Sequence, residues 1–182
     1  HGNYEDISSI SVNGKELSST LTDLISKIGE NIQIISFKKY NSENSIFINY
    51  LHNKYNSSCS KIASVVEIST NDTKKASEIS DDLKVIAMQV SAMKPIGLNE
   101  ESLDPKIISD ERDIILKQID NTPDDKKEQI VKGKLNKFIK ENTLMGQTLI
   151  TDQKNTVANY VSSLSKSNNL DLNITLMDLY TV

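Results

Sequence analysis

The stretch LKVIAMQVSAMKP, residues 83–95, decides the fold because its apolar residues recur at the three- and four-residue spacing of an amphipathic helix. The pattern extends upstream and predicts a helix over about residues 77–92. Pro95 and Gly97 would end this helix, since proline cannot continue one. The core-facing side of the helix would carry Ile79, Leu83, Ile86, Val90 and Met93.

The remaining residues of this stretch predict a structural role. Gln89 and Ser91 are expected on the solvent side, and Met88 and Met93 are interpreted as fillers of the core rather than as a functional methionine site. The stretch has no pattern typical of a catalytic site. We therefore expect a scaffold whose function lies in the surface that it offers to another protein.

Four other segments predict β-strands. The runs 32–39, 45–52 and 61–68 are rich in β-branched residues and are separated by polar segments, which is typical of an antiparallel sheet. Segment 169–176 alternates between apolar and polar residues, as a strand with one buried face does. Its apolar positions are Leu170, Leu172, Ile174 and Leu176.

Two further amphipathic helices are expected outside the central stretch. One covers about residues 15–29, with Asn13 and Glu16 as its N-terminal capping pair and Gly29 as its C-cap. The other lies around residues 154–165. The apolar face of the first helix would carry Leu17, Leu21, Leu24 and Ile28.

Residues 104–144 differ in character because they are strongly charged and contain two helical patterns joined by the turn NTPDD. They predict an antiparallel helical hairpin resembling a short coiled coil. Ile108 and Ile115 of the first arm would face the second arm at Val131, Leu135, Phe138 and Met145. The whole chain is accordingly expected to have an α+β fold, a small antiparallel sheet flanked by helices with this hairpin inserted.

Composition argues against several classes of function. The formal net charge is −4 and Arg112 is the sole arginine, so nucleic acid is disfavoured as a direct ligand. Cys59 with His1 and His52 cannot assemble a zinc site or an internal disulfide, and we expect neither metal nor cofactor. No apolar run is long enough to cross a bilayer, and the first ten residues lack the pattern of a signal peptide, which favours an intracellular protein.

No arrangement of residues predicts an enzyme. His52 follows an apolar-polar alternation and has no serine or acid near it in a recognisable nucleophile pattern. Without further information a solvent-facing histidine at a strand end is the better interpretation of this residue. Paired carboxylates at 81–82, 100–101 and 124–125 lie at expected helix starts or turns, where they offset the helix dipole or tighten a bend.

Four strings resemble the translation elongation factor Ts family, in the same order and at family spacing. They are LTDLISKIGENIQI, LKVIAMQVSAMKP, IVKGKLNKFIKENTLMGQ and NTVANYV, and the resemblance covers about residues 17–176. Some positions depart from the family pattern: Gln89 stands in place of a histidine and Lys134 in place of an arginine. Thr148 and Leu149 replace proline and phenylalanine, and residues 35–36 replace an arginine pair.

The resemblance implies a division into subdomains. Residues 1–30 would be the end of the family's N-terminal core subdomain, 31–101 with 145–182 the C-terminal core subdomain, and 102–144 the inserted hairpin. The family's N-terminal domain and its Thr-Asp-Phe motif would lie upstream, and the missing initiator methionine suggests a fragment or a processed product. Residues 22–24, Thr-Asp-Leu, do not replace that motif, because the leucine belongs to an apolar helix face.

The resemblance also implies a function. Family members are guanine nucleotide exchange factors that bind the GTPase elongation factor Tu in its GDP form and promote release of GDP, in the bacterial cytoplasm or, alternatively, in an organelle matrix. The positions that match family contacts to domain 3 of that partner are Ile28, Gly29, His52, Ile150 and Thr151.

Three alternatives remain open at this point. Ile28 could instead be a core residue and Gly29 only a helix cap. The chain could also be a homodimerising module that pairs through its hairpin, as some family members do. An unrecognised hydrolase would require a cleft around His52 that strongly perturbs its titration.

Overall fold

The computed structural model describes residues 10–12 and 14–182 and divides into two compact units, His1–Asn41 and Ser42–Val182. We call them the first and the second unit and describe each by itself. In the first unit, β1 (Ser11–Val12) pairs antiparallel with β2 (Lys15–Glu16), and α2 (Leu17–Ile28) follows directly.

Helix α2 ends as predicted but begins differently. Gly29 is in the left-handed region with φ 78°, and its N–H donates to the carbonyl of Ile25 at 2.8 Å, which confirms it as the C-cap. The N-cap is Glu16, without a side-chain capping bond, and the predicted cap Asn13 lies outside the described residues. No residue of α2 is buried.

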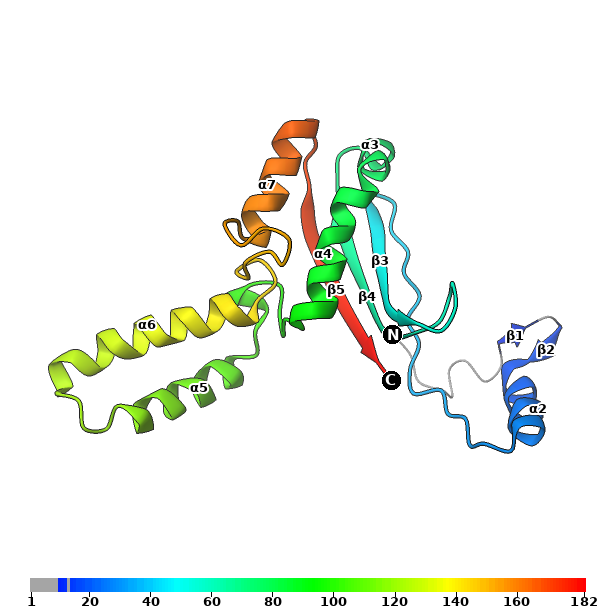
Figure 1. Cartoon of the computed structure of the whole chain (residues 1–182), viewed down its shortest axis with the longest axis horizontal. Helices are drawn as coiled ribbons and strands as arrows, with labels where there is room; N and C mark the ends of the chain where they lie inside the picture. The colour runs from blue at the N-terminus through cyan, green and yellow to red at the C-terminus, as the bar shows by residue number, and fades with distance from the viewer. Residues whose placement is uncertain (1–9, 13) are drawn as a thin grey trace. The chain divides into compact units, whose positions relative to one another are not determined.

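The second unit is built on a three-stranded antiparallel sheet in the order β3-β4-β5 (Figure 1). The strands are β3 (Ser45–Lys54), β4 (Ser60–Ser69) and β5 (Asn173–Thr181). They confirm the strands predicted at 45–52 and 61–68. The strand predicted at 32–39 is wrong, since that run forms none, and strand propensity depends on tertiary context more than helix propensity does.

A β-bulge in β5 changes which of its residues face the core. Ile68 pairs with Ile174 whereas Glu67 pairs with Leu176, so Thr175 is an extra residue on β5. After the bulge, Met177 and Leu179 pack against the core. The predicted inward alternation therefore holds through Ile174 and is wrong at Leu176, which pairs beside Glu67 on the other face.

The helices α3 (Thr73–Glu78), α4 (Ser80–Met93) and α7 (Val157–Asn168) belong to the same unit, and α4 lies along β3 and β4 (Figure 1). The helix predicted over 77–92 is thus two helices, interrupted at Ile79. The core forms between α4, α7 and the sheet. Its fully buried side chains include Val66, Ile68, Leu83, Ile86, Val90 and Val157.

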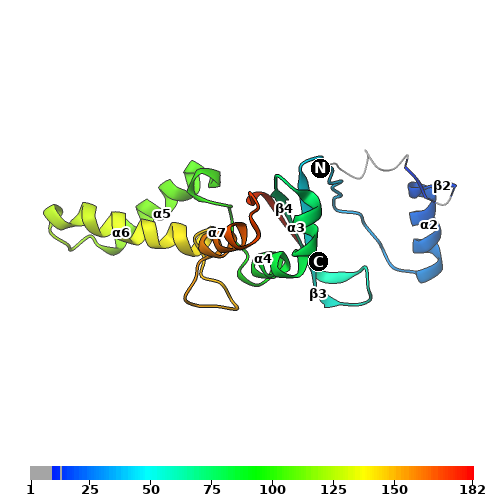
Figure 2. The same ribbon diagram turned by 90° about the horizontal axis from the view of Figure 1, so that it is seen from above.

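The predicted hairpin is present as α5 (Pro105–Gln118) and α6 (Asp124–Asn142), preceded by the short 3-10 helix η1 (Glu100–Ser102). The two arms run side by side in both views (Figures 1 and 2). Their seam is a separate cluster of Ile115, Ile119, Val131, Ile130 and Leu135. These elements confirm the α+β prediction.

The prediction that Met145 belongs to the hairpin seam is wrong. Met145 packs against the core of the sheet instead, because α6 ends at Asn142 and the chain has already turned back. The base of the hairpin is closed by backbone bonds, in which the N–H groups of Leu144 and Met145 donate to the carbonyls of Gly97 and Leu98 at 2.9 Å each.

Candidate functional site

His52 and Ile150, far apart in the sequence, line one cavity of the second unit. The cavity has a volume of about 240 Å³ and lies between the end of β3, the last turns of α4 and the loop before α7. Its remaining lining residues are Tyr50, Met88, Ser91 and Ala92. The structure thus brings together two of the predicted partner-binding residues, although their role in binding stays a prediction.

His52 is exposed at the strand end, where it pairs in register with Ile62. Its ring lies next to that of Tyr50, with the ring centres 6.1 Å apart. The Tyr50 hydroxyl is 3.4 Å from Nδ1 of His52, close enough for a long hydrogen bond. Tyr50 therefore favours one orientation of the imidazole and leaves the rest of the ring available to a partner.

The loop between α6 and α7 presents Ile150 and Thr151. Leu149 is buried and its N–H donates to the carbonyl of Asn155 at 2.9 Å, while the N–H of Val157 donates to the carbonyl of Gln147 at 3.0 Å. These contacts fix both sides of the loop. Between them Ile150 is 39% exposed and Thr151 is exposed.

Asp152 closes the turn that follows these residues. One carboxylate oxygen accepts from the Asn155 side-chain amide at 2.6 Å and the other accepts from the N–H of Lys154 at 3.0 Å. The two bonds, that of Asn155 first, lower the pKa of Asp152 below its ordinary value. The turn is therefore stabilised by a carboxylate that stays charged at neutral pH.

The prediction that Gln89 and Ser91 face solvent is wrong, because both are buried. They lie on the two flanks of the apolar stripe of α4, and each flank is covered: the loop around Gln147 covers Gln89, and Ser64 of β4 covers Ser91. The spacing of apolar residues within one helix cannot show that a segment from a distant part of the sequence will cover its polar side.

The role predicted for Met93 as a core filler is wrong as well. Its side chain is 48% exposed. Met93 is the last residue of α4, and the chain turns away at Lys94, which is in the left-handed region. The apolar stripe of the helix is therefore one residue shorter than the pattern suggests.

Ile28 and Gly29 belong to the first unit, so they are described separately from the site around His52. Ile28 is 51% exposed, which does not support its alternative interpretation as a core residue. A Cβ at Gly29 would meet nothing within 4 Å, but a substitution there is strained because φ is positive.

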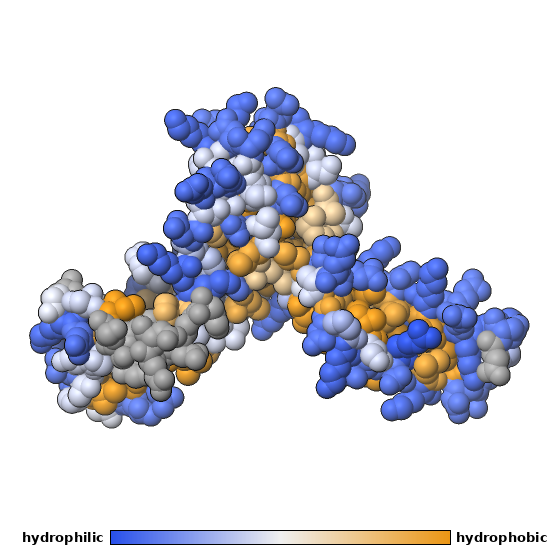
Figure 3. Space-filling model, turned by 180° about the vertical axis from the view of Figure 1, so that it is seen from behind, coloured by the Kyte–Doolittle hydropathy of each residue, from blue (hydrophilic) through white to orange (hydrophobic). Residues whose placement is uncertain are grey.

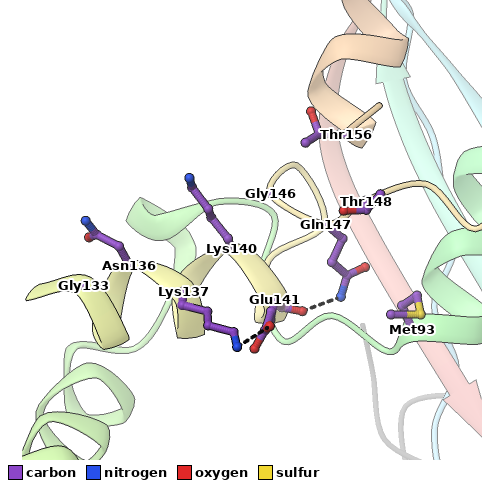
Figure 4. Close-up of a pocket in the computed structure, with 10 residues that line it drawn as sticks. All are labelled: Met93, Gly133, Asn136, Lys137, Lys140, Glu141, Gly146, Gln147, Thr148 and Thr156. Atoms are coloured by element: carbon purple, nitrogen blue, oxygen red, sulfur yellow. Dashed lines mark hydrogen bonds and ion pairs between the residues drawn. The ribbon is translucent and has the colours of Figure 1, made fainter. Parts of the chain in front are cut away.

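A larger cavity of about 540 Å³ is lined in part by residues 146–148 of the same loop (Figure 4). Gln147 and Thr148 line it together with the end of α6, where Lys137 is 3.7 Å from Glu141. The 147–150 loop thus contributes to the lining of two cavities, and of these two only the smaller one is lined by predicted site residues.

The described part of the chain, residues 10–12 and 14–182, contains no group of three or more His, Cys, Asp or Glu side chains that could hold a metal ion. Within the same residues, no helix combines the length and the apolar character that a membrane span requires. The cavity of His52 and Ile150 is lined by apolar and polar side chains, with no carboxylate or lysine among them.

Comparison with known proteins identifies the family. The family model described as "Elongation factor TS" matches residues 1–182. The chain belongs to the elongation factor Ts family. An elongation factor Ts of Flavobacterium psychrophilum is 35% identical over 164 residues, 89% of this chain and 56% of the relative.

Two more relatives named elongation factor Ts give similar values. The protein of Alkalilimnicola ehrlichii is 33% identical over 155 residues, 84% of this chain and 49% of the relative. That of Clostridium acetobutylicum is 32% identical over 166 residues, 90% of this chain and 50% of the relative. The predicted resemblance to elongation factor Ts is confirmed, and the chain spans about half the length of the curated relatives it matches.

Proposed function

We propose that this chain acts in guanine nucleotide exchange during translation and that it does so by binding elongation factor Tu. The 182 residues would contact domain 3 of that GTPase through Ile150, Thr151 and His52 of the second unit and through Ile28 and Gly29 of the first. Membership of the elongation factor Ts family supports the general role. The contact residues are those that match family positions, and the cavity shared by His52 and Ile150 supports two of them.

The observation that carries the proposal is the shared cavity of His52 and Ile150. A partner side chain placed in this cavity would contact the imidazole of β3 and the exposed Ile150 at once. The cavity is also lined by Met88 and Ala92, which are apolar, and by Ser91. Apolar or aromatic residues that enter such pockets are typical of the side chains that dominate binding energy.

No covalent step is needed for this function. An exchange factor accelerates GDP release because it binds the nucleotide-free partner more tightly than the GDP-bound one. We infer that the surface around His52 supplies affinity, whereas the part that distinguishes the two states is the Thr-Asp-Phe motif of the family. That motif does not occur within these 182 residues.

The proposal includes the subdomains and the setting. Residues 31–101 with 145–182 would form the C-terminal core subdomain, 102–144 an inserted hairpin, and 1–30 the end of the preceding subdomain. The relatives are bacterial proteins, which supports a bacterial cytoplasm over an organelle matrix.

Alanine substitution tests the surface. His52→Ala and Ile150→Ala should each weaken binding to elongation factor Tu by about 1–3 kcal/mol, the usual range for an interface contact that matters. Calorimetric titration measures the affinity. Both side chains are exposed, so the melting temperature should change little.

Ile114→Ala is the matched control, because Ile114 is exposed to a similar degree but lies on α5. It should leave the affinity unchanged. If both His52→Ala and Ile150→Ala bind with unchanged affinity, the proposed contact surface is wrong. If His52→Ala binds normally but loses much stability, His52 has a structural role instead.

The hairpin favours a second candidate function, self-association. Ile107 and Ile114 are 36% and 47% exposed and lie seven residues apart on α5, outside the seam with α6. Apolar residues reach the surface of the hairpin between charged ones (Figure 3). A second copy of the hairpin could cover this stripe, as in a short coiled coil.

Light scattering distinguishes the two candidates. A homodimer would show twice the monomer mass at high concentration and revert to monomer in an Ile107→Gln, Ile114→Gln variant. If the wild-type chain has the monomer mass at micromolar and at millimolar concentration, self-association through α5 is excluded. Binding to the GTPase should be the same for the wild-type chain and for the Ile107→Gln, Ile114→Gln variant.

A further inference from the structure

We propose that Gln89, together with Gln147, is a positioning residue that fixes Ile150 and Thr151 beside His52. The proposal rests on the proposed function, since it assigns a role in binding to a residue that is itself inaccessible to a partner. Gln89 is fully buried on α4 and Gln147 is nearly so.

Among the residues that the structure describes, the side chain of Gln89 bonds only to the loop that carries Ile150. Its Nε2 donates to Oε1 of Gln147 and to the carbonyl of Thr148, both at 3.1 Å. Its Oε1 accepts the N–H of Ile150 at 2.9 Å. One amide thus contacts three of the four residues 147–150, and the last of these contacts is the backbone of the proposed binding residue itself.

Gln147 extends these contacts to the hairpin. Its Nε2 donates to the carbonyl of Glu141 in the last turn of α6 at 2.9 Å (Figure 4). Its own carbonyl accepts the N–H of Val157, the first residue of α7. The two glutamines therefore connect α4, the end of α6 and the start of α7 around the loop.

The opposite flank of α4 is fixed to the sheet that carries His52. Ser91 Oγ donates to Ser64 Oγ at 2.9 Å, and Ser64 Oγ donates to the carbonyl of Ala87 at 2.6 Å. Ser64 pairs in register with Tyr50, the neighbour of the His52 ring. Polar contacts on its two sides thus join α4 to β4, which pairs with β3, and to the loop, so α4 sets the position of Ile150 relative to His52.

Hydrophobic packing alone would not fix the loop in this way. Apolar contacts are non-directional, whereas a buried amide stays paired only if its donors and acceptors meet their partners at defined distances and angles. The described side chains leave no buried polar atom without a partner. A shift of the loop would unpair Gln89 in a dry environment, where an unmet bond is costly.

Hydrogen exchange on the chain alone tests the first half of the proposal. In Gln89→Leu the N–H of Ile150 loses its acceptor and should exchange about tenfold faster, the factor expected for one lost hydrogen bond. The N–H of Leu149 donates to Asn155 and is the internal reference. Leu83→Ala is the control, because it destabilises the buried face of the same helix and removes no hydrogen bond of the loop.

Affinity for elongation factor Tu tests the second half. Gln89→Leu should weaken binding about three- to tenfold, while Leu83→Ala should leave it unchanged although it also lowers stability. In the double variant with Ile150→Ala the two losses should not add, since Gln89 acts through Ile150. If Gln89→Leu does not fold, Gln89→His at pH 8 is measured, where a neutral imidazole keeps one donor and one acceptor. It should retain most of the affinity.

The outcomes distinguish the positioning role of Gln89 from the proposed function. Normal exchange of Ile150 in Gln89→Leu overturns the proposal whatever the affinity does. Faster exchange with unchanged affinity, while Ile150→Ala still weakens binding, overturns positioning but leaves the proposed function intact. If Ile150→Ala and His52→Ala both bind normally, the proposed function itself fails, and the role of Gln89 in binding fails with it.

Discussion

Helices α4 and α5 have the same length, 14 residues, and differ in what covers them. In α4 six residues are buried, two of them polar, because the sheet covers the apolar stripe and other segments cover both flanks. In α5 only Ile115 is buried, because α6 covers a single side. The difference teaches that a core helix can position a distant surface, whereas a hairpin helix mainly stabilises its own partner.

The largest expected effect is a loss of stability on the core side of this comparison. Leu83 is fully buried in the cluster between α4, α7 and the sheet. Leu83→Ala should lower the free energy of unfolding by about 2–5 kcal/mol through lost burial and the cavity left behind. Chemical denaturation measures this change, and a loss below about 1 kcal/mol would mean that the core collapses around the site or is looser than described.

Ile115→Ala is the counterpart in the hairpin. Ile115 is as well buried as Leu83, but in the separate cluster with Ile119 and Val131. We expect α5 and α6 to lose most of their hydrogen-exchange protection while the amides of β4 keep theirs, because the hairpin can open locally. Comparable loss of protection in β4 would contradict the proposal that residues 102–144 form a separate inserted element.

The smallest expected effect concerns the turn after Thr151. Removing the Asn155 amide removes the larger cause of the lowered pKa of Asp152, so Asn155→Ala should raise that pKa toward the ordinary value. In the wild type this charge supports the folded turn above the pKa of the unfolded state, and the support is lost as pH falls through the lower folded pKa.

A side-chain carboxyl titration by NMR checks this prediction, with Asn159→Ala as the control. Asn159 is one helical turn further along and its backbone N–H, not its side chain, bonds to Thr156. An unchanged midpoint for Asp152 in Asn155→Ala would mean that the N–H of Lys154 alone lowers its pKa.

Much of the fold follows from local patterns in the sequence. The apolar spacing at Leu83, Ile86 and Val90 predicts the buried face of α4, and Gly29 predicts the end of α2. Both depend on neighbours within one or two turns of the same helix. The paired charges and the turn before α6 likewise predict a hairpin, because antiparallel helices need only a short connection.

Features that depend on distant segments could not be predicted in this way. Gln89 is buried because the 147–150 loop folds over it, and Leu176 leaves the core face because Thr175 forms a bulge against β4. The site shows the same limit. Family resemblance indicates His52 and Ile150, but the cavity between them exists only once α4 fixes the sheet and the loop.

The most direct test of the central claim is the release of fluorescent GDP from elongation factor Tu, followed by stopped flow with a saturating amount of the 182-residue chain. We predict that the chain binds the GDP-bound and nucleotide-free forms with similar affinity and competes with a full-length family member, yet hardly accelerates release. A surface that contacts both states equally cannot shift the equilibrium between them. Acceleration comparable to that of the full-length protein would contradict the account and place the determinants of exchange within these residues.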